Sequence, residues 1–288
     1  RNGPVVASNV LAYSVTFEDS GTYNSTREKN LTLNGIAYQV LQILSKNGDS
    51  LSDNFHITVN DHGDYAFDVD EGFTLNRFRA DVYGEAQIDN LSDEQKNATA
   101  AQMMDYLTGS NGFSIVLYGK DAYTSEELAA HSLPEELTKQ EILEIAIMRY
   151  QLNTNSFKKY MPVTIATNVS EKSVAAIREN QSALQGIDIV EDSTRKYVED
   201  ESMAPILGYT GQASSEELEN LRKDNPDYSN DAIVGKAGIE QYMELELQGK
   251  DGEETVTVDN LGKVLDIDNS KTVDPVAGND VYLSIDSD

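Results

Sequence analysis

The sequence V-G-K-A-G-I-E-Q-Y-M-E-L-E-L, from Val234 to Leu247, combines two glycines with apolar residues at helical spacing. The apolar positions fall at the i, i+3, i+4 and i+8 spacing of one helical face and are Ile239, Tyr242, Met243 and Leu247. Gly235 and Gly238 allow a tight backbone entry and a close approach to a neighbouring strand. Glu240 lies in the first turn, where the helix dipole favours a carboxylate. The stretch therefore predicts an amphipathic helix entered through a glycine hinge.

Composition limits the size of the core and the kinds of partner. The chain has 288 residues and is 39% hydrophobic, which favours an elongated or multi-lobed shape over one large core. Its net charge of −28 arises from 22 basic and 50 acidic residues. Nucleic acid is excluded as a partner because it requires a basic surface. The acidic balance also disfavours adsorption to anionic lipid and fits an extracytoplasmic location.

Several classes of site and segment are absent from the sequence. The chain contains no cysteine, so disulfides, iron–sulfur clusters and cysteine nucleophiles are excluded. No apolar run approaches the ~20 residues of a membrane span, and no signal peptide is visible. Because the chain starts at Arg1 and not at methionine, we expect a trimmed fragment.

Periodicity predicts the order of the elements. Residues 4–18 read as a half-buried strand and residues 19–29 as a polar loop, and Asn34 is expected to cap the next helix. Residues 55–69 predict a hairpin. Capping boxes, which predict the starts of further helices, are Ser92-x-x-Gln95, Thr124-x-x-Glu127 and Thr138-x-x-Glu141. The first of these boxes is expected to open one helix that runs to about Leu107.

The pattern changes after residue 155. Residues 162–190 predict a strand, a helix and a second strand, which is a unit that packs a helix on a small sheet. Residues 253–268 predict a hairpin, and residues 279–286 alternate well enough to predict a final strand.

Catalytic strings are present but in the wrong order. Penicillin-recognising enzymes use S-x-x-K, then S-x-N, then K-[ST]-G. The S-x-x-K strings here are Ser156 to Lys159 and Ser193 to Lys196, and Ser52-Asp53-Asn54 precedes both. No K-[ST]-G occurs, so we expect no catalytic residue in this chain.

Histidines and acidic strings do not predict a metal or cofactor site. His56, His62 and His131 are the three histidines, and none adjoins a G-x-S-x-G elbow. The acidic strings at 68–72 and 266–270 lack the glycine and glutamate of an EF-hand. We expect no cofactor and no metal. A carboxylate pair for glycoside hydrolysis stays open as an alternative, since 50 acids allow many pairs.

Short motifs spread along the chain resemble the pedestal, or dimerisation, module of class B penicillin-binding proteins. Residues 1–7 resemble the second half of R-G-x-I-x-D-R-N-G-x-x-L-A. The opening stretch resembles G-x-x-G-x-E, and L-x-G-x-x-G follows from Leu247 to Gly252. The middle motifs are Val163 to Ser170, Leu184 to Ile189, Arg195-Lys196-Tyr197 and Leu207 to Gly211. The tail from Pro275 to Asp286 resembles the strand that leads into the transpeptidase, whereas Val198 replaces a usual proline.

This resemblance implies an α+β fold of three parts. We expect an elongated pedestal of long β-strands with a packed helix, a small strand–helix–strand head lobe and a mainly helical insertion. Residues 1–30 and 191–288 would form the β-rich stalk, 31–155 the insertion and 156–190 the head lobe. The membrane anchor and the transpeptidase domain would lie outside the fragment.

The resemblance also implies a non-catalytic spacer. The module would hold a serine-type D-Ala-D-Ala transpeptidase domain of the same parent chain over the cell wall, outside the bacterial membrane. Its implied partners are that domain, a membrane-embedded glycan polymerase, other cell-wall assembly proteins and a second copy in a homodimer. The alternatives are an extracytoplasmic carbohydrate hydrolase and an extracytoplasmic ligand-binding protein.

A structural joint is expected where the motifs converge. Arg1 and Arg195 are candidates to pair with Glu240, since guanidinium–carboxylate forks fix geometry between separated segments. The other residues assigned to the joint are Tyr197, Gly235 and Gly238. The alternative is an ordinary surface ion pair worth ~0–1 kcal/mol.

Overall fold

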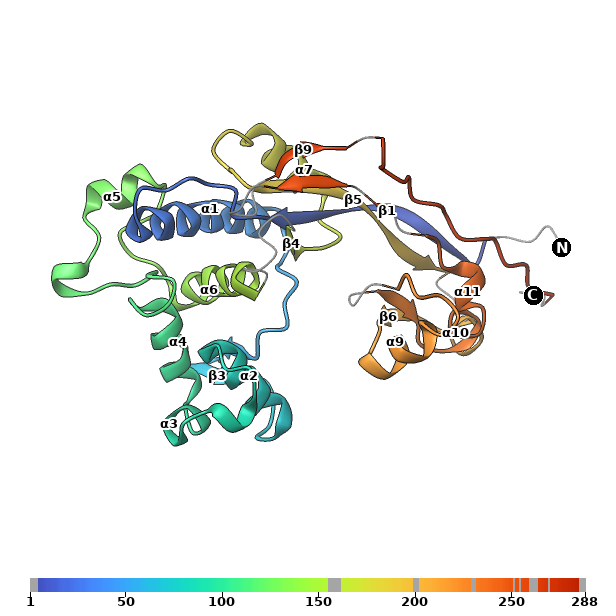
Figure 1. The fold of residues 1–288 in the computed structure, drawn as a ribbon, viewed down its shortest axis with the longest axis horizontal. Coiled ribbons are helices and arrows are strands. Elements are labelled where there is room, and N and C mark those ends of the chain that lie inside the picture. Colours follow the sequence, from blue (N-terminus) through green and yellow to red (C-terminus); the bar gives the residue numbers. More distant parts are fainter. Residues whose placement is uncertain are drawn as a thin grey trace. The chain divides into compact units, whose positions relative to one another are not determined.

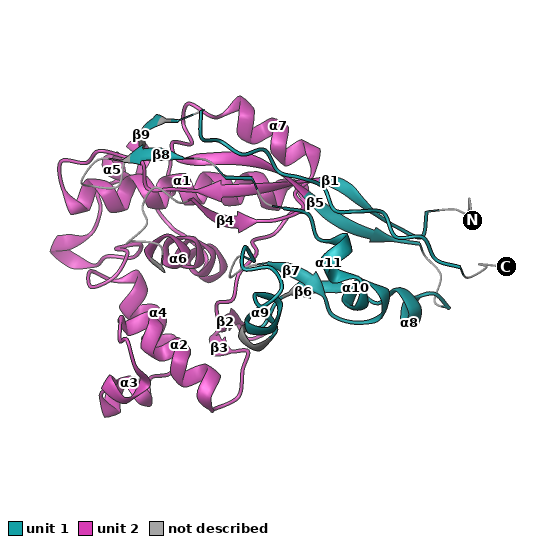
Figure 2. Cartoon of the chain, turned by 45° about the vertical axis from the view of Figure 1, so that its right-hand side comes forward, with its two compact units in different colours: residues 1–11, 193–260, 264–288 teal, residues 12–192, 261–263 magenta. Residues whose placement is uncertain are grey.

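The computed structural model describes residues 5–154, 162–198, 202–228, 232–250, 252–253, 255–258, 264–268 and 270–284. The chain divides into two compact units, shown in Figure 2. Unit 1 comprises Arg1–Leu11, Ser193–Asn260 and Val264–Asp288, and unit 2 comprises Ala12–Asp192 and Leu261–Lys263. The three-part division expected from the sequence stays a prediction.

Two long strands belong to both units. They are β1 (Ala7–Phe17) and β5 (Ile187–Tyr197), each 11 residues long. Together with β4 (Val163–Ala166) they form a sheet in the order β4-β1-β5. β1 pairs antiparallel with β4, with Phe17 opposite Val163 and a register shift between Val15 and Thr16. The predicted strand at 187–190 thus continues to Tyr197.

Unit 2 is mainly helical (Figure 1). Its helices are α1 (Thr26–Asn47), α2 (Phe73–Tyr83), α3 (Asp93–Lys96), α4 (Ala100–Thr108), α5 (Ser125–Ala130), α6 (Lys139–Thr154) and α7 (Glu171–Glu179), with 3-10 turns η1 (Ile88–Asn90) and η2 (Gly119–Asp121). The predicted hairpin is β2 (Ile57–Val59) paired with β3 (Tyr65–Phe67). α1 packs on α6 and α7, and α6 also packs on β4. The predicted mixture of helix and sheet is confirmed.

The start of α1 differs from the sequence prediction. Ser25 caps the helix by accepting a hydrogen bond from the Glu28 amide, so the helix begins inside the stretch predicted as a loop. Asn34 lies in the middle of α1, is 2% exposed and donates to the Phe113 carbonyl (3.1 Å). The prediction that Asn34 is a cap is wrong, because this amide serves a buried polar contact and not a helix end.

The helix predicted from Ser92 to about Leu107 is in fact two helices. α3 ends at Lys96, and a second capping box, Thr99 with Gln102, opens α4. Each box satisfies backbone N–H groups that a helix start leaves without partners. The chain therefore turns between two helix starts where one continuous helix was predicted.

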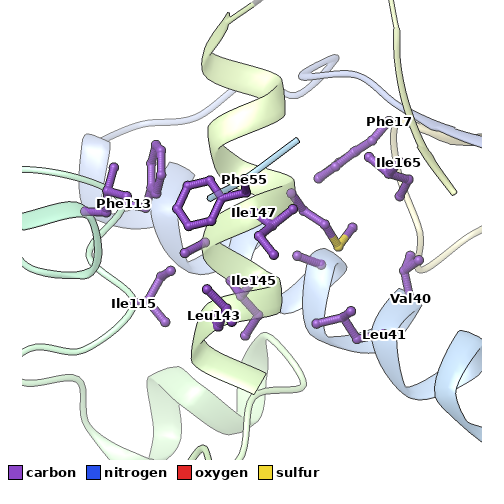
Figure 3. Packing of buried hydrophobic residues seen from close by; sticks show 14 of the residues in the cluster. Phe17, Val40, Leu41, Phe55, Phe113, Ile115, Leu143, Ile145, Ile147 and Ile165 are labelled. Atoms are coloured by element: carbon purple, nitrogen blue, oxygen red, sulfur yellow. The ribbon is translucent and has the colours of Figure 1, made fainter. Parts of the chain in front are cut away.

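One large apolar cluster forms the core of unit 2. Figure 3 shows side chains of α6, including Ile145 and Ile147, gathered with Val40 and Leu41 of α1. Phe17 of β1 and Ile165 of β4 belong to the same cluster. Phe55 packs edge-on against Phe78 with ring centroids 5.0 Å apart. This core supplies most of the apolar burial that stabilises unit 2.

Unit 1 consists of short elements. They are α8 (Ala204–Leu207), β6 (Thr210–Gln212), α9 (Ser215–Leu221), β7 (Ile233–Gly235), α10 (Gly238–Tyr242), α11 (Glu244–Leu247), β8 (Val256–Val258) and β9 (Val264–Ile267). β6 pairs antiparallel with β7, and β8 with β9. The final strand predicted at 279–286 is not formed over residues 279–284, and residues 285–288 lie outside the described part.

Within the described part of the chain, no helix combines the length and the apolar character that crossing a membrane requires.

Candidate functional site

The opening glycine stretch folds as two short helices where one was predicted. α10 ends at Tyr242 and α11 begins at Glu244, with Met243 between them at φ −104° and ψ 20°. The predicted apolar face is wrong at Tyr242, which is 84% exposed. The inward positions are Glu240 and Glu244, which are 5% and 8% exposed. They face inward because each finds hydrogen-bond donors within unit 1.

Glu240 pairs with Arg195. The Arg195 Nε donates to Glu240 Oε1 at 2.8 Å, and Arg195 Nη1 donates to Asn9 Oδ1 at 3.2 Å. The side chains of Arg195 and Glu240 are 20% and 6% exposed. A guanidinium on β5 thereby connects β1 with α10, three segments far apart in the sequence. Arg1, the other candidate for this pairing, lies outside the described residues.

Glu244 was missed by the sequence analysis. Its Oε1 accepts a hydrogen bond from the Tyr228 hydroxyl (3.0 Å), and its Oε2 accepts one from the Gly235 amide (2.7 Å). Burial and the nearby Glu244 carboxylate raise the pKa of Tyr228. The spacing of Glu240 and Glu244, four residues apart in a predicted helix, was the available signal, because such residues share a face.

Gly208 and Gly238 pack against each other's segments. Gly208 has φ +80°, and a Cβ there would overlap the carbonyl group of Ala237. Gly238 has φ +60°, and a Cβ there would overlap the backbone of Ile206 to Gly208. Both positions require glycine for conformation and for space.

Gly235 and Tyr197 lie beside Glu240. A Cβ on Gly235 would overlap the backbone of Glu240 and Gln241, so the expected close approach is to a helix and not to a strand. Burial raises the pKa of Tyr197; Glu240 adds to the rise, whereas Thr210 and Arg195 oppose it. Four of the other residues assigned to the joint therefore lie close to Glu240, namely Arg195, Tyr197, Gly235 and Gly238. The functional importance of the joint stays a prediction.

The glycines of L-x-G-x-x-G make room for the returning tail. Residues 273–279 run antiparallel to 246–253, with Lys250 and Val276 exchanging backbone hydrogen bonds of 2.7 and 2.9 Å. A Cβ on Gly249 would overlap the Val276 carbonyl, and one on Gly278 would overlap that of Leu247. This motif therefore has a packing role.

One S-x-x-K string overlaps the joint, because it contains Arg195, and the other lies outside the described residues. Ser193 to Lys196 form part of β5, and Ser156 to Lys159 fall within the undescribed 155–161. His56 contacts Asp68 at 3.1 Å on an exposed surface. Among the described residues, no group of three or more histidine, aspartate or glutamate side chains is placed to hold a metal ion.

A cavity of about 440 Å³ in unit 2 contains two aspartates that bear on the hydrolase alternative. Burial raises the pKa of Asp53. Asp81 accepts hydrogen bonds from Arg77 Nε (3.1 Å) and Nη2 (2.5 Å). Asp53 and Asp81 thus have different surroundings, and the hydrolase alternative stays untested.

The fold and the joint define a mixed helix-and-sheet module held by buried carboxylates and close glycine contacts. Residues 1–283 match the family described as the Penicillin-binding Protein dimerisation domain, and the chain belongs to that family.

Curated relatives include the peptidoglycan D,D-transpeptidase MrdA of Salmonella typhimurium strain LT2. It is 32% identical over 145 residues, which cover 50% of this chain and 23% of that protein. MrdA of Acinetobacter baumannii is 32% identical over 150 residues, covering 51% of this chain and 22% of that protein. The aligned part thus spans about a fifth of the length of these relatives.

Solved structures that are similar include penicillin-binding protein 2B of Streptococcus pneumoniae strain 5204. That likeness has 20% identity and a TM-score of 0.49, and covers 95% of this chain and 36% of that one. A complex between the penicillin-binding protein PBP2 and MreC from Helicobacter pylori has 16% identity and a TM-score of 0.37, covering 96% and 32%.

Proposed function

We propose that this chain is the non-catalytic pedestal of a peptidoglycan transpeptidase. The observation that carries the proposal is the match of residues 1–283 to the penicillin-binding protein dimerisation domain. The joint of Glu240 with Arg195 and Asn9 supports it, because a spacer must transmit position without bending.

The joint suits a spacer physically. Its charged hydrogen bond is largely removed from water, where such bonds are stronger than at an exposed surface. The glycine contacts bring backbones together with no flexible side chain between them. The chemistry of this joint is that of a stiff connection, since both buried glutamates accept hydrogen bonds from the protein itself.

The parent protein is proposed to be a serine-type D-Ala-D-Ala transpeptidase anchored in the bacterial cell membrane. Its pedestal would lie outside the membrane and contact a membrane-embedded glycan polymerase and other cell-wall assembly proteins. The MrdA relatives support this proposal through the activity in their name. Self-association into a homodimer is a further proposal of the same kind.

The test measures two properties separately: acylation of the protein by penicillin, and peptidoglycan cross-linking, which depends on how the transpeptidase domain is positioned. The 288-residue chain alone should take no covalent label from a fluorescent penicillin, whereas the parent protein should. Glu240→Ala in the parent should leave the penicillin acylation rate unchanged and reduce peptidoglycan cross-linking in cells, and Glu219→Ala, an exposed glutamate on α9, is the matched control. A covalent penicillin adduct on the isolated chain would overturn the proposal.

A further inference from the structure

Unit 2 contains a second cavity, of about 270 Å³, lined in part by α1, α4 and α6. The lining residues that matter here are Lys29, Leu33, Asn111, Phe113, Arg149 and Asn153. They combine cationic, amide and apolar groups in a space large enough for a small ligand.

Arg149 is the unusual member of this lining. It is 5% exposed, and burial lowers its pKa to about 10, so it stays cationic at neutral pH. Its guanidinium lies 5.1 Å from the centre of the Phe113 ring. A buried charge is costly unless a counter-charge accompanies it.

The hydrogen-bond partners of Arg149 are neutral. Its Nη2 donates to Asn30 Oδ1 at 2.9 Å, and its Nη1 donates to Asn34 Oδ1 and more weakly to the Asn30 carbonyl at 3.5 Å. These bonds use two N–H groups of Nη1 and one of Nη2, and a guanidinium carries five. Across the described residues, two of its N–H groups therefore remain for another acceptor.

Asp19 supplies part of the counter-charge of Arg149, acting on it electrostatically without a hydrogen bond to it. Asp19, which also lines the cavity, accepts a hydrogen bond from the Tyr23 hydroxyl (2.9 Å) and pairs with Lys29. Glu18 is a second carboxylate in the lining, and burial raises its pKa. Residues 155–161, which follow α6, contain neither aspartate nor glutamate.

We propose that this cavity binds the free carboxylate of a short peptide or acylated amino acid, with Arg149 as the anion-binding residue. The remaining N–H groups, on Nε and Nη2, suit a carboxylate, because guanidinium–carboxylate pairs are frequently bidentate. Asn111 and Asn153 would bind the amide of the ligand, and Leu33 and Phe113 would contact a small apolar side chain. The inference does not depend on the pedestal role.

The probe is N-acetyl-alanyl-alanine, titrated into the 288-residue chain by calorimetry and compared with its C-terminal amide. We expect the acid to bind at least about tenfold more tightly, since a charge-assisted pair exceeds a neutral one by that much. The D,D and L,L stereoisomers form separate arms that distinguish a cell-wall peptide from an ordinary one. Equal affinity for acid and amide, or no binding, overturns the proposal.

Substitutions at Arg149 and Asn111 test whether the ligand binds in this cavity. Arg149→Lys should retain weak acid preference and Arg149→Gln should abolish it, provided that circular dichroism shows both folded. Asn111→Trp would fill the mouth of the cavity from an exposed position and should abolish binding with Arg149 intact. Asn90→Trp, on the exposed η1, is the matched control and should bind normally. Binding that survives Asn111→Trp overturns the assignment to this cavity.

Discussion

At the residue scale, Glu240 is a buried charge whose partner is known. Removing it would leave Arg195, whose side chain is 20% exposed, without its carboxylate. We expect Glu240→Ala to lower the free energy of unfolding by about 2–3 kcal/mol, below the fully buried case because Arg195 retains some water. The melting temperature should fall by about 5 °C. Thermal melting monitored by circular dichroism measures this.

The control for that change is Glu219→Ala, which removes an exposed glutamate from α9 of the same unit. It should alter the melting temperature by less than about 1 °C, as exposed substitutions do. Equal melting temperatures for wild type and Glu240→Ala would mean that the pair is an ordinary surface ion pair.

Tyr228 gives a second residue-scale prediction. Tyr228 is 4% exposed, and its hydroxyl donates to the buried Glu244. Tyr228→Phe should destabilise unit 1 by about 1–2 kcal/mol, because one oxygen of a buried carboxylate loses its donor. Tyr242→Phe, at 84% exposure, is the comparison and should be neutral in urea unfolding. A neutral Tyr228→Phe would show that water replaces the lost donor.

The burial and the hydrogen-bond partners of polar residues were the features that the sequence predicted least well. Glu240 and Arg195 were assigned together because motif resemblance named them. Asn34 was predicted to cap a helix and Asn30 was assigned no role, yet both are buried partners of Arg149. A sequence shows that a side chain is polar, but only the packed fold shows that its partner is 115 or more residues away.

At the element scale, the contact between Gly208 and Gly238 holds α8 against α10. Gly208→Ala should lower the free energy of unfolding by roughly 3 kcal/mol or more, since it adds a backbone clash to a conformation, φ +80° and ψ −152°, that essentially only glycine adopts. Gly63→Ala is the matched control, because Gly63 has φ +77° and open space around it. Gly63→Ala should lower the free energy of unfolding by about 1–2 kcal/mol. Chemical unfolding measures both, and equal losses would remove the clash from the explanation.

Glu217, in the first turn of α9, should make the free energy of unfolding depend on pH in the acidic range. Hydrogen bonds from Lys236 Nζ (2.6 Å) and the Ser214 amide (2.7 Å) lower the pKa of Glu217 to about 2. A glutamate with a lowered folded-state pKa stabilises the fold above its ordinary value of 4.5, and that stability is lost as the pH falls toward 2.

Lys236→Met should therefore lower the melting temperature at pH 6, and its difference from wild type should shrink between pH 4.5 and pH 2. Melting curves across that range measure the effect. Lys172→Met, an exposed lysine on α7, is the control. A difference that stays constant down to pH 2 would show that Lys236 acts by packing alone.

Element types were predicted better than element ends. The capping boxes predicted at Ser92, Thr124 and Thr138 are all present, because each depends only on residues three apart. The break at Met243 was not predictable from periodicity, since it depends on Glu240 and Glu244 reaching donors on other segments. Local chemistry thus specifies helix starts, whereas tertiary contacts specify where helices are interrupted.

At the scale of the whole molecule, the two units are stabilised by different interactions. Unit 2 has a large apolar cluster built from helices and strands. The cluster in unit 1 consists of Leu218, Tyr228 and Val234, with a few half-buried neighbours. Unit 1 therefore depends more on buried hydrogen bonds and glycine contacts than on apolar burial. The family membership was predictable from motif order, but this asymmetry was not, because the burial of Glu244 was not predicted.

Hydrogen exchange tests this asymmetry directly. Because apolar burial is the dominant stabilising contribution, backbone amides of α10 and α11 should exchange faster than those of α1 and α6. Glu240→Ala should raise exchange further in α10 and leave α6 nearly unchanged, since its lost hydrogen bond lies within unit 1. Mass spectrometry of peptides from both units provides the measurement. Uniform acceleration across the chain would mean that the units unfold together, and the glutamate would then contribute to the stability of the entire protein.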